Sequence, residues 1–307
     1  MTSVANPING ATVASPPDRH GDADEDAPES VPGVGEIVLV ASGKGGVGKS
    51  TVAVNLACSL RRLGLNVGLL DADIFGPSVA GLLGTGEGLA VDDDGRAVPN
   101  ERHGIHSVSV ANILAPEAAM PWKGPLVAQA VTQLFRDVAW PDLDVLIVDL
   151  PPGTGDVQLT ILEQIPVAGA VAVTTPQRLS TVDAERGISL FHEHDIPVFG
   201  VVRNMGEYVC PCCGERQPLF DAGEVAAIAQ DTHVADLGQI PLDPGASARA
   251  DAGTPLVIAE PDGPLAEAFL DLGRKVMAAI AREQRGRARR GTQAGDQQAF
   301  WDRLLDD

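Results

Sequence analysis

A glycine-rich segment at residues 43–51 carries the clearest chemical signal in the chain. It begins Gly-Lys-Gly-Gly-Val-Gly-Lys-Ser, which fits the phosphate-binding pattern G-x-x-x-x-G-K-[ST]. Glycines let successive backbone N–H groups curl around phosphate oxygens, and the N-terminus of a following helix adds partial positive charge. We expect Lys49 to contact the β- and γ-phosphates, Ser50 to ligate Mg²⁺ and Thr51 to add a hydrogen bond. The predicted ATP–Mg²⁺ site comprises Gly43, Lys44, Gly45, Gly46, Val47, Gly48, Lys49, Ser50 and Thr51.

Three residues elsewhere in the chain are predicted to join this site. Asp149 ends an apolar segment and precedes Pro-Pro-Gly, so its carboxylate can reach Mg²⁺ through water. The N–H of Gly153, the glycine of that turn, can swing toward a γ-phosphate. Asp73 follows another apolar segment, and we expect it to position the attacking water; the alternative is that it caps a short helical turn. Lys49, Asp73 and Asp149 are therefore candidate catalytic residues.

Three of the four cysteines lie together in the segment Val209-Cys-Pro-Cys-Cys-Gly-Glu215. Cys210 and Cys213 have the Cys-x-x-Cys spacing that lets two thiolates face one metal centre. Such a pair is half a site, because structural zinc and iron–sulfur clusters each take about four ligands. Two copies of the chain would bring enough thiolates to a two-fold axis. A structural zinc site and a redox dithiol are the alternatives.

The remaining cysteines indicate the chemical setting. Cys212 is an additional thiol within the cluster, and Cys58 lies in a helical segment where we expect it to pack as a small apolar residue. Four cysteines in 307 residues do not make a disulfide framework. The cysteine content therefore indicates a reducing, cytoplasmic location.

Alternating apolar and helical segments must position these residues. We expect strands at 36–41, 66–71, 144–149, 168–174 and 198–203, and helices at 50–60, 182–192 and 265–282. The pattern predicts an α/β fold over residues 36–284, a doubly wound, mostly parallel sheet with helices on both faces. Residues 1–35 are expected to form a disordered acidic tail, and residues 285–307 a linker with a short amphipathic tail.

The charge of the chain excludes some classes of partner. Its 22 Lys and Arg against 42 Asp and Glu give a net charge of −20. Such a field repels phosphate, so we expect no binding to nucleic acid or to an anionic membrane. No apolar stretch approaches the roughly 18–20 residues of a membrane span, and the first 30 residues lack the basic and apolar regions of a secretory signal.

The second lysine of the glycine-rich segment, Lys44, gives the variant Lys-Gly-Gly-Val-Gly-Lys-Ser. This resembles the deviant Walker A motif of the MinD, ParA and nitrogenase-iron-protein class of P-loop ATPases. In that class the early lysine crosses a dimer interface to the partner's nucleotide. The resemblance thus implies a nucleotide-sandwich homodimer in which Lys44 is a further catalytic residue.

Several other segments resemble the Mrp/ApbC family of iron–sulfur cluster carriers across residues 36–282. They are Asp71-Ala-Asp-Ile-Phe-Gly-Pro-Ser78, Pro121-Trp-Lys-Gly-Pro125, Asp149-Leu-Pro-Pro-Gly-Thr-Gly-Asp156, Thr174-Thr-Pro-Gln177 and Asn204-Met205 before the cysteines. The resemblance implies slow ATP hydrolysis coupled to transfer of a [4Fe–4S] cluster, bridged by Cys210 and Cys213 of two subunits. It also implies upstream assembly proteins and apoprotein clients as partners. Asn204 would read the adenine edge, and Pro241, in the segment Gln239–Asp243, would flank the base.

Two related classes fit less well. A spatial organiser of the MinD or ParA type needs a basic membrane-binding helix or a basic DNA-binding surface, whereas this chain ends Phe-Trp-Asp-Arg-Leu-Leu-Asp-Asp. A reductase iron protein needs a cysteine soon after the Walker B region, and residues 150–208 contain none.

Trp301 and its apolar neighbours in the tail either dock on the domain, dock on a client or belong to a frayed terminus.

Overall fold

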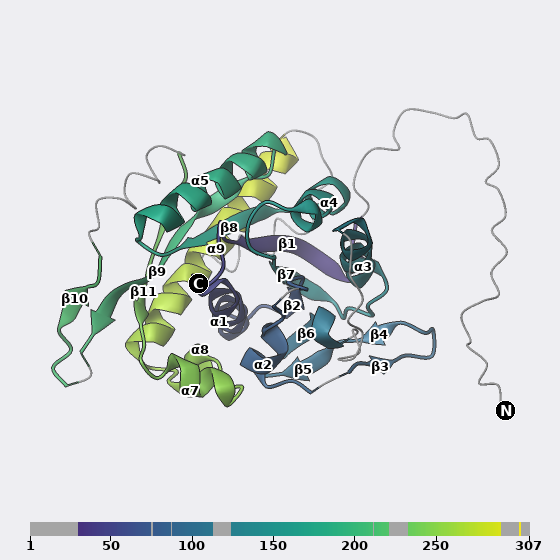
Figure 1. Ribbon diagram of the computed structural model, residues 1–307. Helices are drawn as coiled ribbons and strands as arrows, with labels where there is room; N and C mark the ends of the chain where they lie inside the picture. Colours follow the sequence, from purple (N-terminus) through teal and green to yellow (C-terminus); the bar gives the residue numbers. More distant parts are fainter. Residues whose placement is uncertain are drawn as a thin grey trace, which may run out of the picture.

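A mainly parallel sheet forms the centre of the computed structural model, which describes residues 30–289 except 75, 87, 113–123, 211 and 221–232, and also Trp301 (Figure 1). The strand order is β10-β9-β8-β1-β7-β2-β6-β5, with β11 also paired to β9. The parallel strands are β1 (Val34–Ala41), β2 (Val67–Asp71), β6 (Ile105–Ser109), β7 (Leu143–Asp149), β8 (Gly169–Thr174), β9 (Val198–Val209) and β11 (Asp236–Leu242). The antiparallel edge strands are β5 (Asn100–Arg102) and β10 (Arg216–Pro218), and a separate hairpin joins β3 (Ala90–Val91) to β4 (Ala97–Val98).

Helices cover both faces of this sheet, which confirms the predicted fold class (Figure 1). One face packs against α1 (Lys49–Arg62), α8 (Leu256–Ala259) and α9 (Pro264–Arg289). The other packs against α3 (Gly124–Arg136), α4 (Asp156–Gln164) and α5 (Arg178–Glu193). The shorter helices are α2 (Val79–Leu83), α7 (Ala246–Asp251) and a 3₁₀ turn at Val110–Asn112.

The central strands are buried because both of their faces meet helices. Their side chains from Ile37 to Ala41 and from Val145 to Asp149 are all buried, as apolar runs of this kind predict. The register pairs Asp149 with Val40 on one side and with Asp71 on the other. The ends of β1, β2 and β7 therefore meet at one edge of the sheet, where ligands bind in folds of this type.

The structure corrects the predicted domain limits at both ends. Val31 is already buried in the core, so the domain begins a few residues before the expected start at 36. Helix α9 runs to Arg289, so residues 285–289 are helical and do not form part of a linker. Gln284 and Arg287 explain this length, since both bind the buried carboxylate of Glu36, at 2.7 and 2.9 Å. The remainder of both predicted tails, apart from Trp301, lies outside the described residues.

Trp301 settles one of the alternatives for the tail. Its side chain is 2% exposed and belongs to the core cluster formed by α1, α9 and the sheet. The Trp301 ring therefore packs in the core of the domain. Within the residues described, no helix combines the length and apolar character needed to cross a membrane.

Candidate functional site: a phosphate loop and a cysteine hairpin

The glycine-rich segment forms the loop between β1 and α1, as its pattern predicts. Gly46 and Gly48 both have φ near 82°, in the left-handed region where glycine carries no steric penalty. Gly48 is the N-cap of α1, so the N–H groups of Lys49 and Ser50 begin the helix. A Cβ built on Gly45 or Gly46 would meet no atom within 4 Å. No side chain or backbone atom of the described residues therefore fills the space beside these two glycines.

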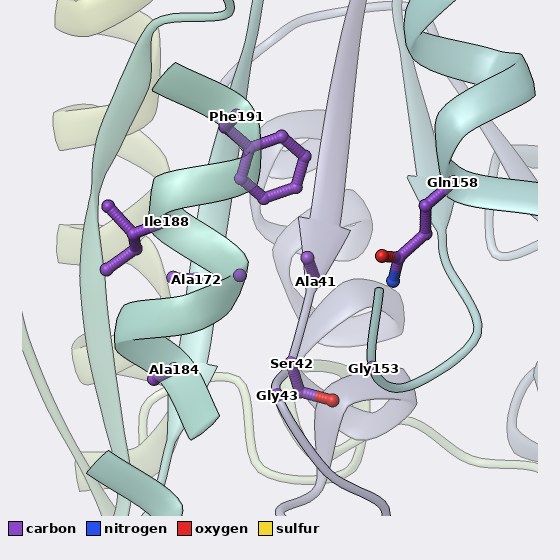
Figure 2. A pocket seen from close by; sticks show the side chains of 10 residues that line it. Ala41, Ser42, Gly43, Gly153, Gln158, Ala172, Ala184, Ile188 and Phe191 are labelled. Carbon is purple, nitrogen blue, oxygen red and sulfur yellow. The ribbon is translucent and has the colours of Figure 1, made fainter. Parts of the chain in front are cut away.

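The start of the loop is packed tightly. A Cβ on Gly43 would lie 2.1 Å from the backbone carbon of Asp183 in α5, so only glycine fits there. A cavity of about 10 Å³ beneath the loop, between α4 and α5, is lined by Gly43, Gln158 and Phe191 among others (Figure 2). That volume is close to one water molecule, so this cavity is a packing gap beside the loop and does not accommodate a nucleotide.

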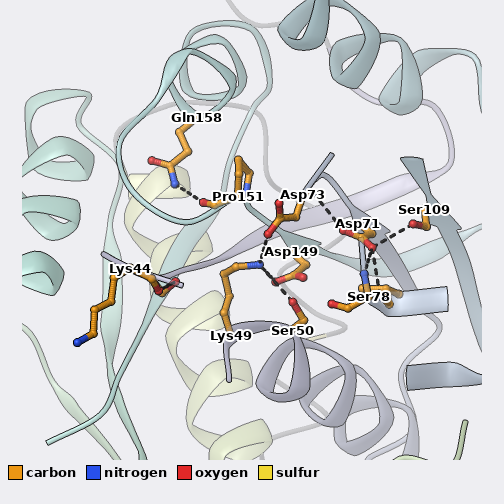
Figure 3. Close-up of polar contacts among 12 residues, drawn as sticks. Lys44, Lys49, Ser50, Asp71, Asp73, Ser78, Ser109, Asp149, Pro151 and Gln158 are labelled. Carbon is orange, nitrogen blue, oxygen red and sulfur yellow. Dashed lines mark hydrogen bonds and ion pairs between the residues drawn. The ribbon is translucent and has the colours of Figure 1, made fainter. Parts of the chain in front are cut away.

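Lys49 gathers the predicted acidic residues around its ammonium group (Figure 3). Its Nζ lies 2.7 Å from Asp149 Oδ1, 3.5 Å from Asp73 Oδ2 and 3.3 Å from the Ser50 hydroxyl. Asp149 is fully buried, and burial raises its pKa to about 6 although the charge of Lys49 acts in the opposite direction. Its second oxygen, Oδ2, has no hydrogen-bond partner among the described residues. The structure therefore brings Lys49, Ser50, Asp73 and Asp149 into one cluster.

Asp71 is a residue of this cluster that the sequence reasoning missed. Its carboxylate accepts hydrogen bonds from the N–H groups of Asp73, Ser78 and Val79, at 3.0–3.1 Å, and from the Ser109 hydroxyl at 3.0 Å. Burial raises its pKa. Asp71 thus holds both the backbone of Asp73 and the first turn of α2. The Asp-x-Asp spacing at the end of β2 was the signal that could have indicated it.

The structure also places Lys44, Thr51 and Gly153, whose predicted roles toward a nucleotide stay predictions. The side chain of Lys44 points away from the Lys49 cluster (Figure 3). The carbonyl of Thr51 accepts from Asn55 Nδ2 at 2.8 Å within α1. Gly153 has a left-handed φ of 90°, and its N–H donates to the Ser42 carbonyl at 2.9 Å. A contact between this N–H and a γ-phosphate stays a prediction that requires the turn to move.

The two residues predicted to contact adenine lie beside the loop. Asn204 Nδ2 donates to the carbonyl of Val47 at 2.8 Å, a buried contact between residues 157 apart in sequence. Ile240 pairs with Asn204 in the sheet, so Pro241, which is buried, follows directly beside it. The structure therefore brings Asn204 to the phosphate loop and places Pro241 one residue beyond the strand partner of Asn204. Their contacts with the base stay predictions.

Cys210 and Cys213 lie in the tight turn between β9 and β10, a hairpin that extends beyond the sheet (Figure 1). The turn is closed by hydrogen bonds from Cys210 N–H to the Glu215 carbonyl and from Gly214 N–H to the Cys210 carbonyl, at 2.9 and 2.8 Å. Hydrogen bonding by the backbone of Cys212 and Cys213 lowers the pKa of Cys210. This geometry favours a thiolate at Cys210, the form that binds metals.

The hairpin of one chain does not complete a metal site. Cys210 is half-buried, and Cys212 and Cys213 are exposed. Among the described residues, no three His, Cys, Asp or Glu side chains converge on a point that could hold a metal ion. Cys58 is buried, and burial raises its pKa to about 12, which confirms that it packs as an apolar residue.

Comparisons with known proteins show the family of the chain. Residues 33–277 match the family described as NUBPL iron-transfer P-loop NTPase, within the ParA group. An iron–sulfur cluster carrier protein from Aquifex aeolicus is 45% identical over 248 residues, which are 80% of this chain and 68% of that protein.

Solved structures extend this likeness to three dimensions. A nucleotide-binding protein from Archaeoglobus fulgidus, in complex with ADP and with Co found by PIXE, is 36% identical with a TM-score of 0.66; the match covers 78% of this chain and 93% of that chain. The cell division ATPase MinD from Pyrococcus furiosus has the same fold, with a TM-score of 0.62 at 20% identity over 80% of this chain and 99% of that one. The phosphate loop, the sheet that carries it and the family match lead to one conclusion: the chain belongs to the Mrp/NUBPL family of P-loop NTPases, the family of the iron–sulfur cluster carrier proteins.

Proposed function

We propose that the protein binds and hydrolyses ATP with Mg²⁺ and carries a [4Fe–4S] cluster between two subunits, from which it transfers the cluster to apoproteins. The observation that carries the proposal is the β9–β10 turn, where Cys210, with its lowered pKa, lies beside Cys213 and no third ligand from the described part of the chain converges with them. A cluster takes about four ligands, so a second subunit must supply the rest. The iron-transfer description of the family supports this cargo.

The groups around the phosphate loop suit a nucleotide with Mg²⁺. The Ser50 hydroxyl and the Asp149 carboxylate are the oxygen donors that Mg²⁺ prefers. The buried Asp149 Oδ2, without a partner in the described part of the chain, is a suitable acceptor for a water of the metal. Bound Mg²⁺ supplies positive charge that stabilises the phosphates during transfer. In this proposal Lys49 holds the β- and γ-phosphates, Asp73 orients the attacking water, and the remaining contacts come from Thr51, Gly153, Asn204 and Pro241.

Lys44 supports a dimer that completes the nucleotide site. Its side chain leaves the cluster around Lys49 within its own chain (Figure 3), so it is free to reach a nucleotide bound by the other subunit. The same two-fold arrangement would bring two Cys210–Cys213 pairs together. One dimer would therefore complete both the ATPase site and the cluster site.

The partners follow from this role. Upstream assembly proteins would deliver the cluster and apo iron–sulfur proteins would accept it, in the reducing cytoplasm. The net charge of −20 disfavours nucleic acid and anionic membranes as partners.

Anaerobic reconstitution with iron and sulfide tests the proposal. We expect a broad absorption band near ~400 nm and about four iron and four sulfide per dimer, the composition of a [4Fe–4S] cluster. The Cys210→Ser and Cys213→Ser variants should each lose the cluster, because each removes one ligand from both subunits. Cys212→Ser is the matched control within the same turn and should lose much less.

The alternatives give different results in the same experiment. Bound zinc without sulfide would make the thiols a structural site, and the protein would then be a dimeric ATPase switch of the MinD or ParA type. A larger loss with Cys212→Ser than with Cys213→Ser would mean that the chosen ligands are wrong.

A further inference from the structure

Strand β9 joins the phosphate loop to the cysteine hairpin through one short piece of backbone. Near its middle, Asn204 Nδ2 donates to the Val47 carbonyl at 2.8 Å, in a buried contact. The contact is tight, because a Cβ on Gly48 would lie 2.2 Å from Asn204 Nδ2 and 3.3 Å from Met205 Cε. The side chains of Asn204 and Met205 therefore occupy the space next to Gly48, the residue that precedes Lys49.

The strand is irregular immediately after this contact. Met205 has a φ of 57°, in the left-handed region that residues with a Cβ rarely adopt. Strand β11 follows β9 up to the pair Ile240–Asn204 and next pairs Leu242 with Tyr208, so the register shifts across Met205. Such a conformation persists only where the surroundings hold it. Met205 is thus a strained joint within β9, between Asn204 and the end that leads to the hairpin.

Beyond the joint, the strand is bound on both sides and leads directly to the first thiol. Tyr208 pairs with Leu242 of β11 on one side and with Gln217 of β10 on the other. Cys210 follows two residues later, and its N–H is fixed to the Glu215 carbonyl at 2.9 Å. A displacement of this end of β9 must therefore move Cys210.

A pocket provides a second connection between the two sites. It has a volume of about 540 Å³ and is lined by Cys210, Pro241, Asp243 and Arg249 among others. Arg249 forms ion pairs with Asp243 and Glu260 across it. Since Pro241 is the residue predicted to flank adenine, the same pocket borders both the base-binding loop and the thiol.

We propose that Asn204 and Met205 are positioning residues that transmit nucleotide binding at the phosphate loop to Cys210 of the same chain, with Met205 as the joint. The inference rests on the nucleotide site of the proposed function but does not require the cluster. Phosphates bound by the loop act on the backbone of Val47 and Gly48, on which these two side chains rest. Because packed contacts switch between discrete arrangements, a change there is carried along β9 to the hairpin.

The rate at which iodoacetamide alkylates Cys210 tests this coupling. In the full chain carrying Cys212→Ser and Cys213→Ser, two cysteines remain, and Cys210 is the accessible one because Cys58 is buried and has a pKa of about 12. The rate is measured on metal-free protein with and without saturating ADP and Mg²⁺. We expect the nucleotide to change the rate by about fivefold or more, a usual size for coupling between two sites.

Met205→Gly tests the joint itself. Glycine adopts the left-handed conformation freely and removes the contact of Cε with the loop, so the variant should bind ADP yet lose the effect of ADP on Cys210. Asparagine also tolerates the left-handed conformation, so Met205→Asn replaces Met205→Gly in this test if the glycine variant is unstable. Asp195→Gly is the matched control, because Asp195 also has a left-handed φ, of 56°. Asp195 is exposed and follows the end of α5 that is remote from the phosphate loop. The control variant should keep the full effect of ADP on the alkylation rate of Cys210.

Each other outcome contradicts a defined part of the inference. If ADP binds the parent chain but leaves the alkylation rate unchanged, the coupling is wrong and the nucleotide site stands. If Met205→Gly binds ADP and keeps the effect, the coupling does not pass through Met205. If the parent chain does not bind ADP, both the coupling and the nucleotide part of the proposed function are wrong.

Discussion

Lys49 Nζ and Asp149 Oδ1 lie 2.7 Å apart in the buried centre of the phosphate-loop cluster. The pair joins the first residue of α1 to the last residue of β7, 100 positions later in the chain. Each charge offsets the free-energy cost of burying the other, because a charge without a partner is strongly disfavoured inside a protein. The residue predicted to hold phosphate and the residue predicted to hold Mg²⁺ are thereby positioned against each other.

Lys49→Ala should abolish ATP binding and hydrolysis and also lower the stability of the domain. Near pH 8 the free energy of unfolding should fall by about 3 kcal/mol, because Asp149 is left buried without its cation. Near pH 5 the loss should be smaller, because the pKa of Asp149 is already raised to about 6 beside Lys49 and rises further without that charge, so the carboxyl is neutral there. Denaturant unfolding at both pH values measures the difference, and undiminished ATPase activity would refute the site.

Lys44→Ala should separate hydrolysis from binding. Its side chain lies away from the Lys49 cluster, so the free energy of unfolding should change by less than about 0.5 kcal/mol. Binding of ADP by a single chain should persist, whereas ATP hydrolysis should be lost because the partner's site lacks its lysine. Calorimetric titration with ADP and a phosphate-release assay measure the two effects. Full hydrolysis in this variant would contradict the role of Lys44 across a dimer.

The contribution of Mg²⁺ to nucleotide affinity should depend on pH. Burial raises the pKa of Asp149 to about 6 in the folded chain. The protonated carboxyl therefore stabilises the fold in acid, and this contribution is lost as the pH rises through about 6. Mg²⁺ has the opposite requirement, because it needs the ionised carboxylate. The gain in ADP affinity on adding Mg²⁺ should therefore fall as the pH is lowered through about 6. Titrations of ADP with and without Mg²⁺ measure this gain in affinity. Asp149→Asn is the control and should show little gain at any pH. A gain in the unsubstituted chain that stays constant down to about pH 5 would contradict the prediction.

Two glycines of the same loop should respond differently to alanine. In Gly43→Ala the new Cβ would lie 2.1 Å from the backbone of Asp183, which cannot move without displacing α5. We expect a loss of about 1–3 kcal/mol, as for other overpacked sites. In Gly45→Ala the Cβ would meet nothing within 4 Å, so stability should change by less than about 0.5 kcal/mol. Thermal unfolding of both variants tests this difference, and equal losses would show that α5 does not constrain the loop.

Trp301 should contribute strongly to stability although it lies beyond α9. Its side chain is 2% exposed within the core, and removing a buried aromatic ring costs about 3–5 kcal/mol. Trp301→Ala should therefore lower the free energy of unfolding by about that amount. Val91→Ala, at a position that is 65% exposed, is the control and should change it by less than about 0.5 kcal/mol. Chemical denaturation measures both, and an unchanged free energy of unfolding in Trp301→Ala would mean that the buried ring adds no stability.

Local patterns in the sequence determined the fold class and the phosphate loop. A glycine-rich motif specifies its own backbone, so residues 43–51 could be located without any knowledge of the sheet. Apolar runs that end in Asp149 or near Asp73 predicted buried strands, because strands covered by helices on both faces carry few polar side chains. The Cys210-x-x-Cys213 spacing likewise indicated a pair of metal ligands before the hairpin was known.

The tertiary structure alone decided the contacts between residues remote in sequence. The strand order places β2 beside β7 and β6, and this order gives Asp71 its partners around Asp73 and Ser109. The pairing of α9 with β1 through Glu36, the burial of Trp301 and the contact of Asn204 with Val47 depend on the same packing. Sequence periodicity reports which face of an element is buried, but it does not report which element covers that face. Side chains whose roles depend on a distant partner could therefore be assigned only from the folded chain.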